Sequence, residues 1–290
     1  MTSTPRTGDD LDQYVSGWVP EPIISQDVLD ASRARNLAGT LDHDESLSNG
    51  AVLQPLWHWV YFSDWPATSE LGEDGHPREG HFLPPIPHRR RMFAGGRLTM
   101  ETPLRIGAHV ERESKVTQTT VKHGRTGSLL FATIEHVYRQ GDEIWLTEQQ
   151  DLVYRSGGST TATFKQTTEP LALPEHTWSR RLETTASLLF RFSALSSNAH
   201  RIHYDYPYAT QVEGFPALVV HGPLLAIQMA ELIRENVPDR RIRVFEFRLL
   251  QPVFLGDAVA VQGQSDGNLA RVSVVSGHGT EHAAAQVEWA

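Results

Sequence analysis

The chain has 290 residues, of which 39% are hydrophobic and 21% are charged, and its formal net charge is −9. This length allows one large domain or two of ordinary size, and the composition is that of a soluble globular protein. The acidic balance excludes general nucleic-acid binding, which depends on neutralising phosphates. The absence of cysteine excludes disulfides, thiolate metal sites and cysteine nucleophiles.

The N-terminal residues 1–20 are expected to form a disordered leader, because the first ten contain no apolar core and hence no secretory signal. No apolar run approaches the ~20 residues needed to cross a bilayer, so no membrane span is expected. A cytoplasmic location fits a chain without cysteine.

Helical patterns are few. Residues 27–41 carry one behind Ser25, and residues 224–233 form the clearest helix, which is apolar on almost every side and is therefore expected to be buried. Long alternating segments predict antiparallel strands joined by short turns. The expected strands are residues 110–121, 128–139, 143–154, 258–265, 270–276 and 282–289.

The chain repeats itself at an offset of 149 residues. Residues 98–110 resemble residues 247–259, with Pro103 matching Pro252 and Gly107 matching Gly256. In each copy a strand meets proline, turns at glycine and leads into another strand, a pattern that suits strand ends and turns. The repeat predicts two related halves, each a helix with a curled antiparallel sheet, and the two sheets could protect their edges by pairing.

The stretch from Ser156 towards Pro174 is poor in apolar residues and rich in small ones, which is typical of a linker. We therefore expect one domain at 21–156, a linker at 157–175 and a second domain at 176–290. The fold class predicted is α+β.

Two basic clusters, at 88–91 and 240–243, are read either as solvated charge runs or as contacts for phosphates. In the first of them, Arg91 is a candidate substrate-binding residue.

The segment 192–205, together with His221-Gly222-Pro223, gathers three histidines, an asparagine and a carboxylate in front of the apolar helix. Polar groups of this kind are costly to bury unless they are paired or used. This window is the predicted active site.

The window resembles the motif of the MaoC-like, R-specific enoyl-thioester hydratases, which runs aromatic-Ser-x-x-Ser-Gly-Asp-x-Asn-Pro-Ile-His-x-Asp. The matching positions in this sequence are Ser193, Ser196, Ile202, His203 and Asp205, and Gly222 matches the His-Gly step before the long helix. The segments 55–62, 72–77, 82–87 and 90–96 are most similar to the mesaconyl-C4-CoA hydratase group. The resemblance covers residues 20–289.

The resemblance implies a double hot-dog fold, in which two long helices are each wrapped by a curved antiparallel sheet. The first half would be a non-catalytic partner and the second half the catalytic domain. The implied reaction adds water to the double bond of an enoyl-CoA thioester, or removes it. His203 would be the acid/base, since the pKa of imidazole lies near working pH.

In this sequence Asn198 stands where the motif has an aspartate, and His200 and Arg201 replace the Asn-Pro pair. An asparagine cannot accept a proton, so Asn198 is expected to orient water through its amide. The backbone N–H of Gly222 would bind the thioester oxygen at the helix N-terminus. These changes resemble a feature of the mesaconyl-C4-CoA hydratase group.

Further candidate substrate contacts are His221, which is alternatively a packing residue, and His200. A branched dicarboxylate such as mesaconyl-C4-CoA or itaconyl-CoA needs a cation for its free carboxylate, and Arg201 is the nearest in sequence. Asp205 is read as structural, orienting Arg201. No metal, cofactor, nucleic acid or membrane partner is expected; the partner is a CoA thioester, and a homodimer is allowed for.

Three alternatives remain open at this point. A linear 3-hydroxyacyl thioester would need an apolar tunnel instead of a cation. The loss of the motif carboxylate allows a non-catalytic acyl-CoA-binding protein. Finally, His203, Asp205 and His221 contain the two-histidine, one-carboxylate set of non-haem iron oxygenases, although their spacing is short for that fold.

Overall fold

The structure is a computed structural model that describes residues 11–45, 47–80, 82–124, 127–156, 164–169, 171–173 and 178–290. None of the described helices is long and apolar enough to cross a membrane. The elements of the first half are, in order, α1 (Asp12–Val15), β1 (Ile23–Val28), α2 (Ala31–Thr40), η1 (Trp57–Val60), η2 (Thr68–Glu70), β2 (Arg89–Met100), β3 (His109–Gly124), β4 (Gly127–Gln140) and β5 (Glu143–Ser156).

The second half repeats this order with one long helix added. Its elements are β6 (Trp178–Leu182), α3 (Ala186–Leu195), η3 (Arg201–His203), η4 (Tyr208–Val212), α4 (Gly222–Asn236), β7 (Ile242–Leu249), β8 (Val259–Asp266), β9 (Leu269–Ser276), η5 (Gly277–Gly279) and β10 (Thr280–Trp289). The six strands expected from the alternating pattern are all present, each with ends within three residues of the prediction.

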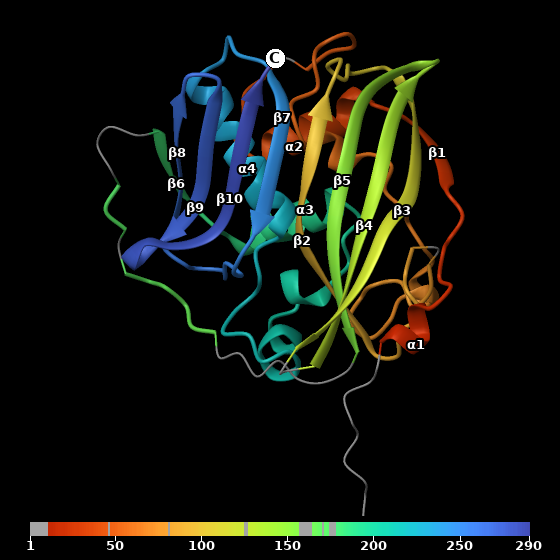
Figure 1. Cartoon of the computed structure of the whole chain (residues 1–290). Coiled ribbons are helices and arrows are strands. Elements are labelled where there is room, and N and C mark those ends of the chain that lie inside the picture. Colours follow the sequence, from red (N-terminus) through yellow and green to blue (C-terminus); the bar gives the residue numbers. More distant parts are fainter. Residues whose placement is uncertain are drawn as a thin grey trace, which may run out of the picture.

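The strands form one antiparallel sheet in the order β1-β3-β4-β5-β2-β7-β10-β9-β8-β6. The two halves meet where β2 pairs with β7, in the middle of the sheet (Figure 1). The predicted edge-to-edge pairing of two sheets is therefore confirmed. It converts two exposed strand edges into one continuous ladder.

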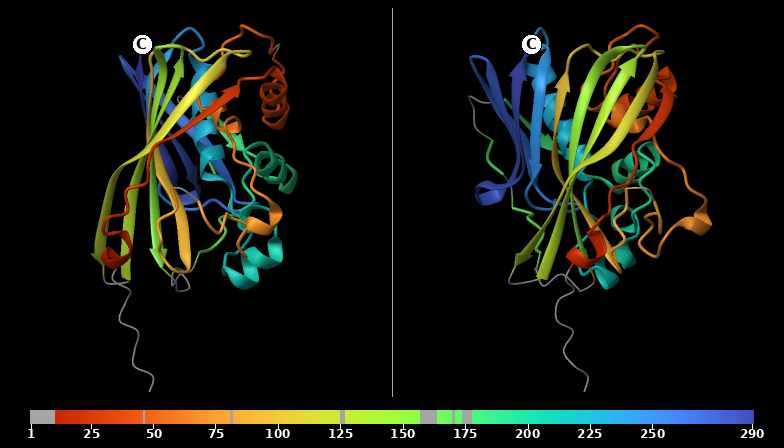
Figure 2. Two further views of the ribbon diagram at one scale, coloured as in Figure 1. Left: turned by 90° about the vertical axis from the view of Figure 1, so that its right-hand side faces the viewer. Right: turned by 45° about the vertical axis from the view of Figure 1, so that its right-hand side comes forward.

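Helices α2, α3 and α4 lie on the same face of the sheet (Figure 2). The predicted helix at 224–233 is confirmed within α4, whose residues from Leu224 to Ile233 are all buried. It packs against β8, β9, β10 and β6, because a helix that is apolar on almost every side must be covered by other elements. The α+β hot-dog architecture of a long helix behind an antiparallel sheet is thus present.

The two copies of the repeat, 98–110 and 247–259, have the same backbone geometry at their turn. Gly107 and Gly256 have φ values of +87° and +89°, a conformation that favours glycine. Isolated bridges pair Val52 with Arg105 in the first half and Val219 with Phe254 in the second. Arg105 and Phe254 occupy the same position of the repeat, so the two halves share this connection as well as the strands.

The halves differ in the element that comes after the bridge. After Val219 the chain enters α4, whereas after Val52 it forms only the short turn η1. In the described part of the first half, the expected second long helix is therefore replaced by η1 and the loop to β2. The helix predicted at 27–41 is the shorter α2, which contacts α3 and η1.

Helix α2 is short because its N-terminus is fixed at Asp30. The carboxylate of Asp30 accepts hydrogen bonds from the backbone N–H groups of Ser32 (2.9 Å) and Arg33 (3.1 Å), as an N-cap residue does. The preceding residues pair with β3 as β1. An edge strand and a cap thus divide a segment whose pattern alone favours one helix.

Part of the expected leader is ordered. Leu11 is 1% exposed and packs in a cluster with Ile86 and Leu130, and α1 comes directly after it. The prediction of a disordered leader is therefore wrong for residues 11–20, because Leu11 is buried against the first-half sheet. Residues 1–10 lie outside the described residues. Most of the expected linker, 157–163, 170 and 174–175, also lies outside them. Within it, Thr167 accepts a backbone hydrogen bond from Ala258 and so is docked on the second half.

The seam between β2 and β7 generates a stability prediction. Gly95 has a φ of +153°, and a Cβ there would lie 2.3 Å from the carbonyl oxygen of Phe247. Gly95→Ala should lower the free energy of unfolding by about 2–4 kcal/mol through strain and overpacking. Gly39→Ala in α2 is the control in denaturant titrations, because the nearest atom to the added Cβ, Nη2 of Arg191, is 3.6 Å away. Equal stability of the two variants would contradict the role assigned to the seam.

Candidate active site

A cavity of about 1800 Å³ lies between the halves, where the first half has η1 in place of a long helix. Residues of both halves line it. The predicted site residues on its surface are Asn198, His200, His203, Gly222 and Arg91. The structure therefore brings five of the seven predicted site residues to one cavity; His221 and Arg201 do not line it.

His203 ends the short turn η3 and is 7% exposed. Its Nδ1 lies 2.7 Å from the carbonyl oxygen of Val219. A carbonyl oxygen can only accept, so Nδ1 carries the hydrogen and Nε2 carries the lone pair. Burial lowers the pKa of His203 to about 4, even though the bond to Val219 acts to raise it. His203 is therefore a neutral imidazole at pH 7, which makes Nε2 a base.

His221 supports His203 from behind. The two rings stack with centroids 3.7 Å apart and planes 18° apart, and His221 is fully buried. Its Nε2 lies 2.8 Å from the hydroxyl of Ser193 in α3. Burial holds the pKa of His221 well below its usual value. The prediction of a substrate contact is therefore corrected, because this ring is covered by His203 and fixes its orientation.

Gly222 is the first residue of α4 and lines the cavity next to His203. A Cβ at Gly222 would lie 2.3 Å from Cδ1 of Leu249, so a side chain there would require the Leu249 side chain of β7 to move. The first N–H groups of a helix have no partner within the helix. Among the described residues, the Gly222 N–H donates to no other group outside α4. It is a donor at the positive end of the helix, in a residue that lines the cavity.

Asn198 lies in the turn between α3 and η3. Its Oδ1 accepts a hydrogen bond of 3.0 Å from the backbone N–H of His200, and its own N–H donates to the carbonyl oxygen of Ser193. The preceding Ser197 has a φ of +53°, at the position where the resembling motif has glycine. Because Oδ1 is used by the turn, the side-chain NH₂ of Asn198 is the group left to contact a ligand.

A loop of the first half adds Asp74 and His76 to this surface. His76 Nδ1 lies 2.9 Å from Asp74 Oδ2. The rings of His76 and His200 have centroids 4.1 Å apart, and those of His200 and His203 are 5.6 Å apart. Four imidazoles, His76, His200, His203 and His221, thus stand in a row.

The electrostatics of this row keep most of it neutral. Burial, together with the neighbouring His76 and His203, lowers the pKa of His200 to about 2. Burial also lowers the pKa of His76, but its bond to Asp74 opposes that effect. Burial acts to raise the pKa of Asp74, yet the hydrogen bonds and charge of His76 lower it to about 2. Asp74 is therefore an anion at one end of the row.

The ligand atoms of Asp74, His76 and His200 lie within 4.8 Å of one another and could hold a metal ion. The alternative iron-oxygenase set is a different one, His203, Asp205 and His221, and its carboxylate is bound to Arg201. Asp205 Oδ2 accepts from Arg201 Nε (2.9 Å) and Nη2 (2.7 Å). His203, Asp205 and His221 do not form a metal-binding group among the described residues.

Arg201 is likewise not a substrate contact. Besides its pair with Asp205, it donates through Nη1 to the carbonyl oxygen of Glu73 (2.9 Å) and lies 4.2 Å from the ring centre of Tyr208. This arrangement corrects the prediction for Arg201 and bears out the structural reading of Asp205. The guanidinium instead ties the second half to the loop that carries Asp74.

Arg91, in β2, is one of several arginines that line the cavity. It lies close enough to His76 and His200 to lower the pKa of both. Of the neighbouring arginines, Arg90 is paired with Glu213 (2.8 Å) and Arg89 donates to the carbonyl oxygen of Pro84 (2.9 Å). No carboxylate among the described residues forms an ion pair with Arg91.

The far end of the cavity contains a buried polar network that sequence reasoning did not find. Glu148, 1% exposed, accepts hydrogen bonds from Trp59 Nε1 (2.7 Å), Gln150 Nε2 (2.8 Å) and Tyr138 OH (3.0 Å), and His58 Nε2 lies 3.0 Å away. Burial acts to raise the pKa of Glu148, but the bond to His58 helps to lower it to about 2. A buried carboxylate satisfied in this way fixes the wall of the cavity.

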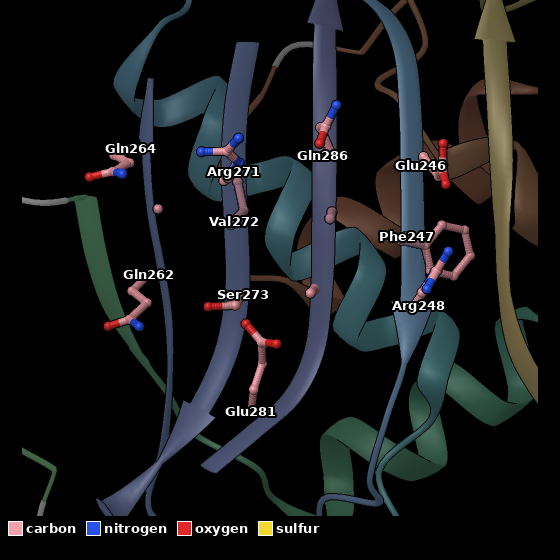
Figure 3. A pocket seen from close by; sticks show the side chains of 13 residues that line it. Glu246, Phe247, Arg248, Gln262, Gln264, Arg271, Val272, Ser273, Glu281 and Gln286 are labelled. Atoms are coloured by element: carbon pink, nitrogen blue, oxygen red, sulfur yellow. The ribbon is translucent and has the colours of Figure 1, made fainter. Parts of the chain in front are cut away.

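A second hollow, of about 680 Å³, lies on the opposite face of the second-half sheet. Its polar side chains, such as Gln262, Arg271 and Glu281, point away from α4, which lies behind the sheet (Figure 3). None of the described residues that line this hollow is a histidine, so the row of imidazoles lies apart from it.

Comparison with known proteins identifies relatives of the whole arrangement. Residues 56–255 match the family model described as hydroxyacyl-thioester dehydratase type 2. Over 240 residues the chain is 42% identical to the mesaconyl-C(4)-CoA hydratase of Chloroflexus aurantiacus. The aligned region covers 82% of this chain and 84% of that protein. It is 29% identical to the mitochondrial hydroxyacyl-thioester dehydratase type 2 of Schizosaccharomyces pombe, covering 75% of this chain and 79% of that protein.

The fold also matches solved structures. A MaoC-like dehydratase from Phytophthora capsici superimposes with a TM-score of 0.67 at 12% sequence identity, covering 97% of this chain and 99% of that chain. At this identity the likeness concerns the fold alone, and it agrees with the double hot-dog architecture expected from the motif.

Sequence reasoning missed Asp74 and His76 as members of the site. The segment 72–77 carries part of the family resemblance, but its residues alone indicate no role. A carboxylate two residues before a histidine in a loop rich in glycine is the available signal. The contact between His76 and His200 cannot be predicted from the sequence, since it joins the two halves of the chain.

The buried histidines predict a pH-dependent stability. His203 has a lowered pKa of about 4 in the folded state against an ordinary value of 6.5. The unfolded chain therefore binds more protons between these values, and stability falls as pH falls from 6.5 to about 4. His203 alone should contribute a loss of up to about 3 kcal/mol. Denaturant titrations from pH 7.5 to 4.5 should show a shallower pH dependence for His203→Gln than for wild type; equal slopes would contradict the neutral buried imidazole.

Proposed function

Because the chain belongs to the hydroxyacyl-thioester dehydratase type 2 family, we propose that it hydrates a branched enoyl-CoA dicarboxylate such as mesaconyl-C4-CoA. Hydratase and dehydratase name the two directions of one hydro-lyase reaction. The observation that carries the proposal is the pairing of His203 Nε2, a neutral base, with the N-terminal Gly222 of α4 on one cavity surface.

In the proposed reaction, His203 Nε2 takes a proton from water as the oxygen adds to the β-carbon of the thioester. The bond from Nδ1 to Val219 holds the tautomer that exposes the lone pair at Nε2. A general base placed in this way accelerates a reaction by typically about 10²–10⁴-fold. In the reverse direction the same nitrogen returns the proton to the departing hydroxide.

Two further groups act on the substrate. The NH₂ of Asn198 donates to the water oxygen and so directs a hydrogen of that water towards His203. The N–H of Gly222 donates to the thioester oxygen, where negative charge develops as the enolate forms. Both donors are held by backbone geometry, Asn198 in its turn and Gly222 in the first turn of α4.

The position of Arg91 supports the substrate class. In mesaconyl-C4-CoA the free carboxylate is attached to the β-carbon, where hydroxide adds. A cation for this carboxylate must therefore lie beside the acid/base groups. Arg91 is within electrostatic reach of His76 and His200 and has no carboxylate partner among the described residues. An arginine can bind a carboxylate through two parallel hydrogen bonds.

The first test concerns the base. His203→Gln should reduce kcat for hydration of mesaconyl-C4-CoA by about 10³-fold, in line with the loss of a general base. The expected KM changes little, since the ring does not supply the main binding contacts. Hydration is followed by the mass gained by the acyl-CoA. A variant that keeps more than a tenth of wild-type kcat would contradict the assignment.

The second test concerns the acyl group. Arg91→Ala should lower kcat/KM for mesaconyl-C4-CoA by about 100-fold or more, as expected for a lost charge-assisted pair. Activity on crotonyl-CoA, which has no free carboxylate, should change little. Arg97→Ala is the matched control, because Arg97 lies on the same strand as Arg91 and its solvent-exposed ion pair is with Glu246 of β7. Preference of the wild type for linear chains over dicarboxylates would refute this substrate class.

A further inference from the structure

The pair Asp74–His76 of the first half is a second acid/base group in the same cavity. We propose that His76, oriented by Asp74, exchanges a proton with the α-carbon of the thioester, while His203 serves the water. This inference rests on the proposed hydration and adds the source of the second proton. It also gives the first half a part in the chemistry, in place of the non-catalytic role expected for it.

Hydration needs two proton transfers at different atoms. Water must lose a proton as its oxygen bonds to the β-carbon, and the α-carbon must gain one. Asn198 has no proton to give, because an amide does not titrate in this range. His221 is enclosed between Phe192, Ser193 and His203. Among the described residues that line the cavity near His203, His76 is the imidazole paired with a carboxylate.

The geometry of His76 repeats that of His203. In each ring Nδ1 faces an acceptor, Asp74 Oδ2 at 2.9 Å in one and the carbonyl oxygen of Val219 at 2.7 Å in the other. Nε2 is therefore the nitrogen that gains and loses a proton in both. The acceptors differ in one respect: only Asp74 carries a charge, so His76 is the ring of the row at which an added proton is stabilised.

The loop that carries the pair is fixed against the second half. The backbone N–H of Arg201 donates to the carbonyl oxygen of Asp74 (2.9 Å), and the Arg201 side chain binds the carbonyl oxygen of Glu73. Gly75 has a φ of +89°, and a Cβ there would lie 1.9 Å from the carbonyl oxygen of Ala199. Two backbone segments in contact leave no room for the loop to shift, so His76 is preorganised beside His200.

His200 separates the two acid/base groups. Its ring is 4.1 Å from that of His76 and 5.6 Å from that of His203, and its pKa of about 2 keeps it neutral. His76 and His203 therefore lie on either side of His200, and both line the cavity that would hold the substrate. His200 also lies on the path by which a proton can pass between them.

The proton balance closes without a further reactant. Water loses a proton to His203 Nε2, its oxygen bonds to the β-carbon, and the electrons of the double bond move to the thioester oxygen at Gly222. The proton on His203 passes through water or His200 to Nε2 of His76, which rests as a neutral imidazole, and Asp74 stabilises the imidazolium that forms. His76 then gives this proton to the α-carbon, where the enolate electrons form the new C–H bond, and both rings are neutral again.

The same cluster could instead hold a metal ion. Arg91 and Arg89 both act to lower the pKa of His76, and Arg89 also interacts with Asp74. This positive field opposes the two charges of a dication more strongly than the single charge of an imidazolium. Two guanidinium groups beside a site with one carboxylate repel an added dication. Asp74 also already accepts two hydrogen bonds from His76, through its ring and its backbone N–H.

The test separates the two groups by proton exchange at the α-carbon. The hydroxyacyl-CoA product is incubated in D₂O, and deuterium at the α-carbon and loss of water are both followed by mass. His203→Gln should lose the elimination of water and keep α-exchange. His76→Gln should lose α-exchange by about 100-fold or more, together with hydration. Asp74→Asn should lower kcat by about 10-fold and move the acidic limb of the pH profile for dehydration to lower pH, since the imidazolium of His76 loses its carboxylate.

His123→Gln is the matched control. His123 Nε2 lies 3.0 Å from Asp12 Oδ2 in an exposed pair away from the cavity, so its loss should leave all rates unchanged. Wild-type hydration that persists in His76→Gln, or α-exchange lost only in His203→Gln, would overturn the inference and leave the proposed function intact. Proton exchange at the α-carbon that depends on His76, in a protein that hydrates no enoyl-CoA, would overturn the proposed function and leave the role of His76 intact. Stoichiometric bound metal with inactivation by a chelator would also overturn the inference.

Discussion

The pairing of β2 with β7 is the constraint on which the rest of the structure depends. It joins two five-stranded halves into one sheet. The close approach of Gly95 to Phe247 shows that the join tolerates no side chain at that point. The catalytic surface lies between the halves because this ladder fixes their relative position. A change in its register would move Arg91, in β2, away from Gly222.

The asymmetry of the two halves creates the room for chemistry. A hot-dog half needs its long helix to fill the curved face of its sheet, and the first half supplies only η1 there. The space becomes the cavity, and the long loop between η1 and β2 enters it with Asp74 and His76. Duplication thus provided two equivalent connections, one of which keeps a helix whose N-terminus binds charge while the other provides volume and side chains.

Much of this could be predicted from residues whose meaning is local. The apolar run in α4, the alternating strands and the Pro-Gly repeat each reflect a short-range pattern. His203 and Gly222 are identifiable because a motif contains both. Arg201 and His221 are misjudged from sequence, since their contacts with Asp205, Glu73 and His203 are not readable there. Asp74 and His76 require the fold itself, because the loop that carries them meets His200 only across the interface between the halves.

The proposed mechanism requires one cavity surface to present a base, an oxyanion donor and a cation to a branched dicarboxylate thioester. The most direct measurement is a crystal structure with methylsuccinyl-CoA, a saturated analogue that cannot react. We expect the thioester oxygen about 3 Å from the Gly222 N–H, the carboxylate on Arg91 and the β-carbon facing His203 Nε2. An acyl group bound in the hollow on the outer face of the sheet, or a thioester oxygen turned away from α4, would contradict this mechanism.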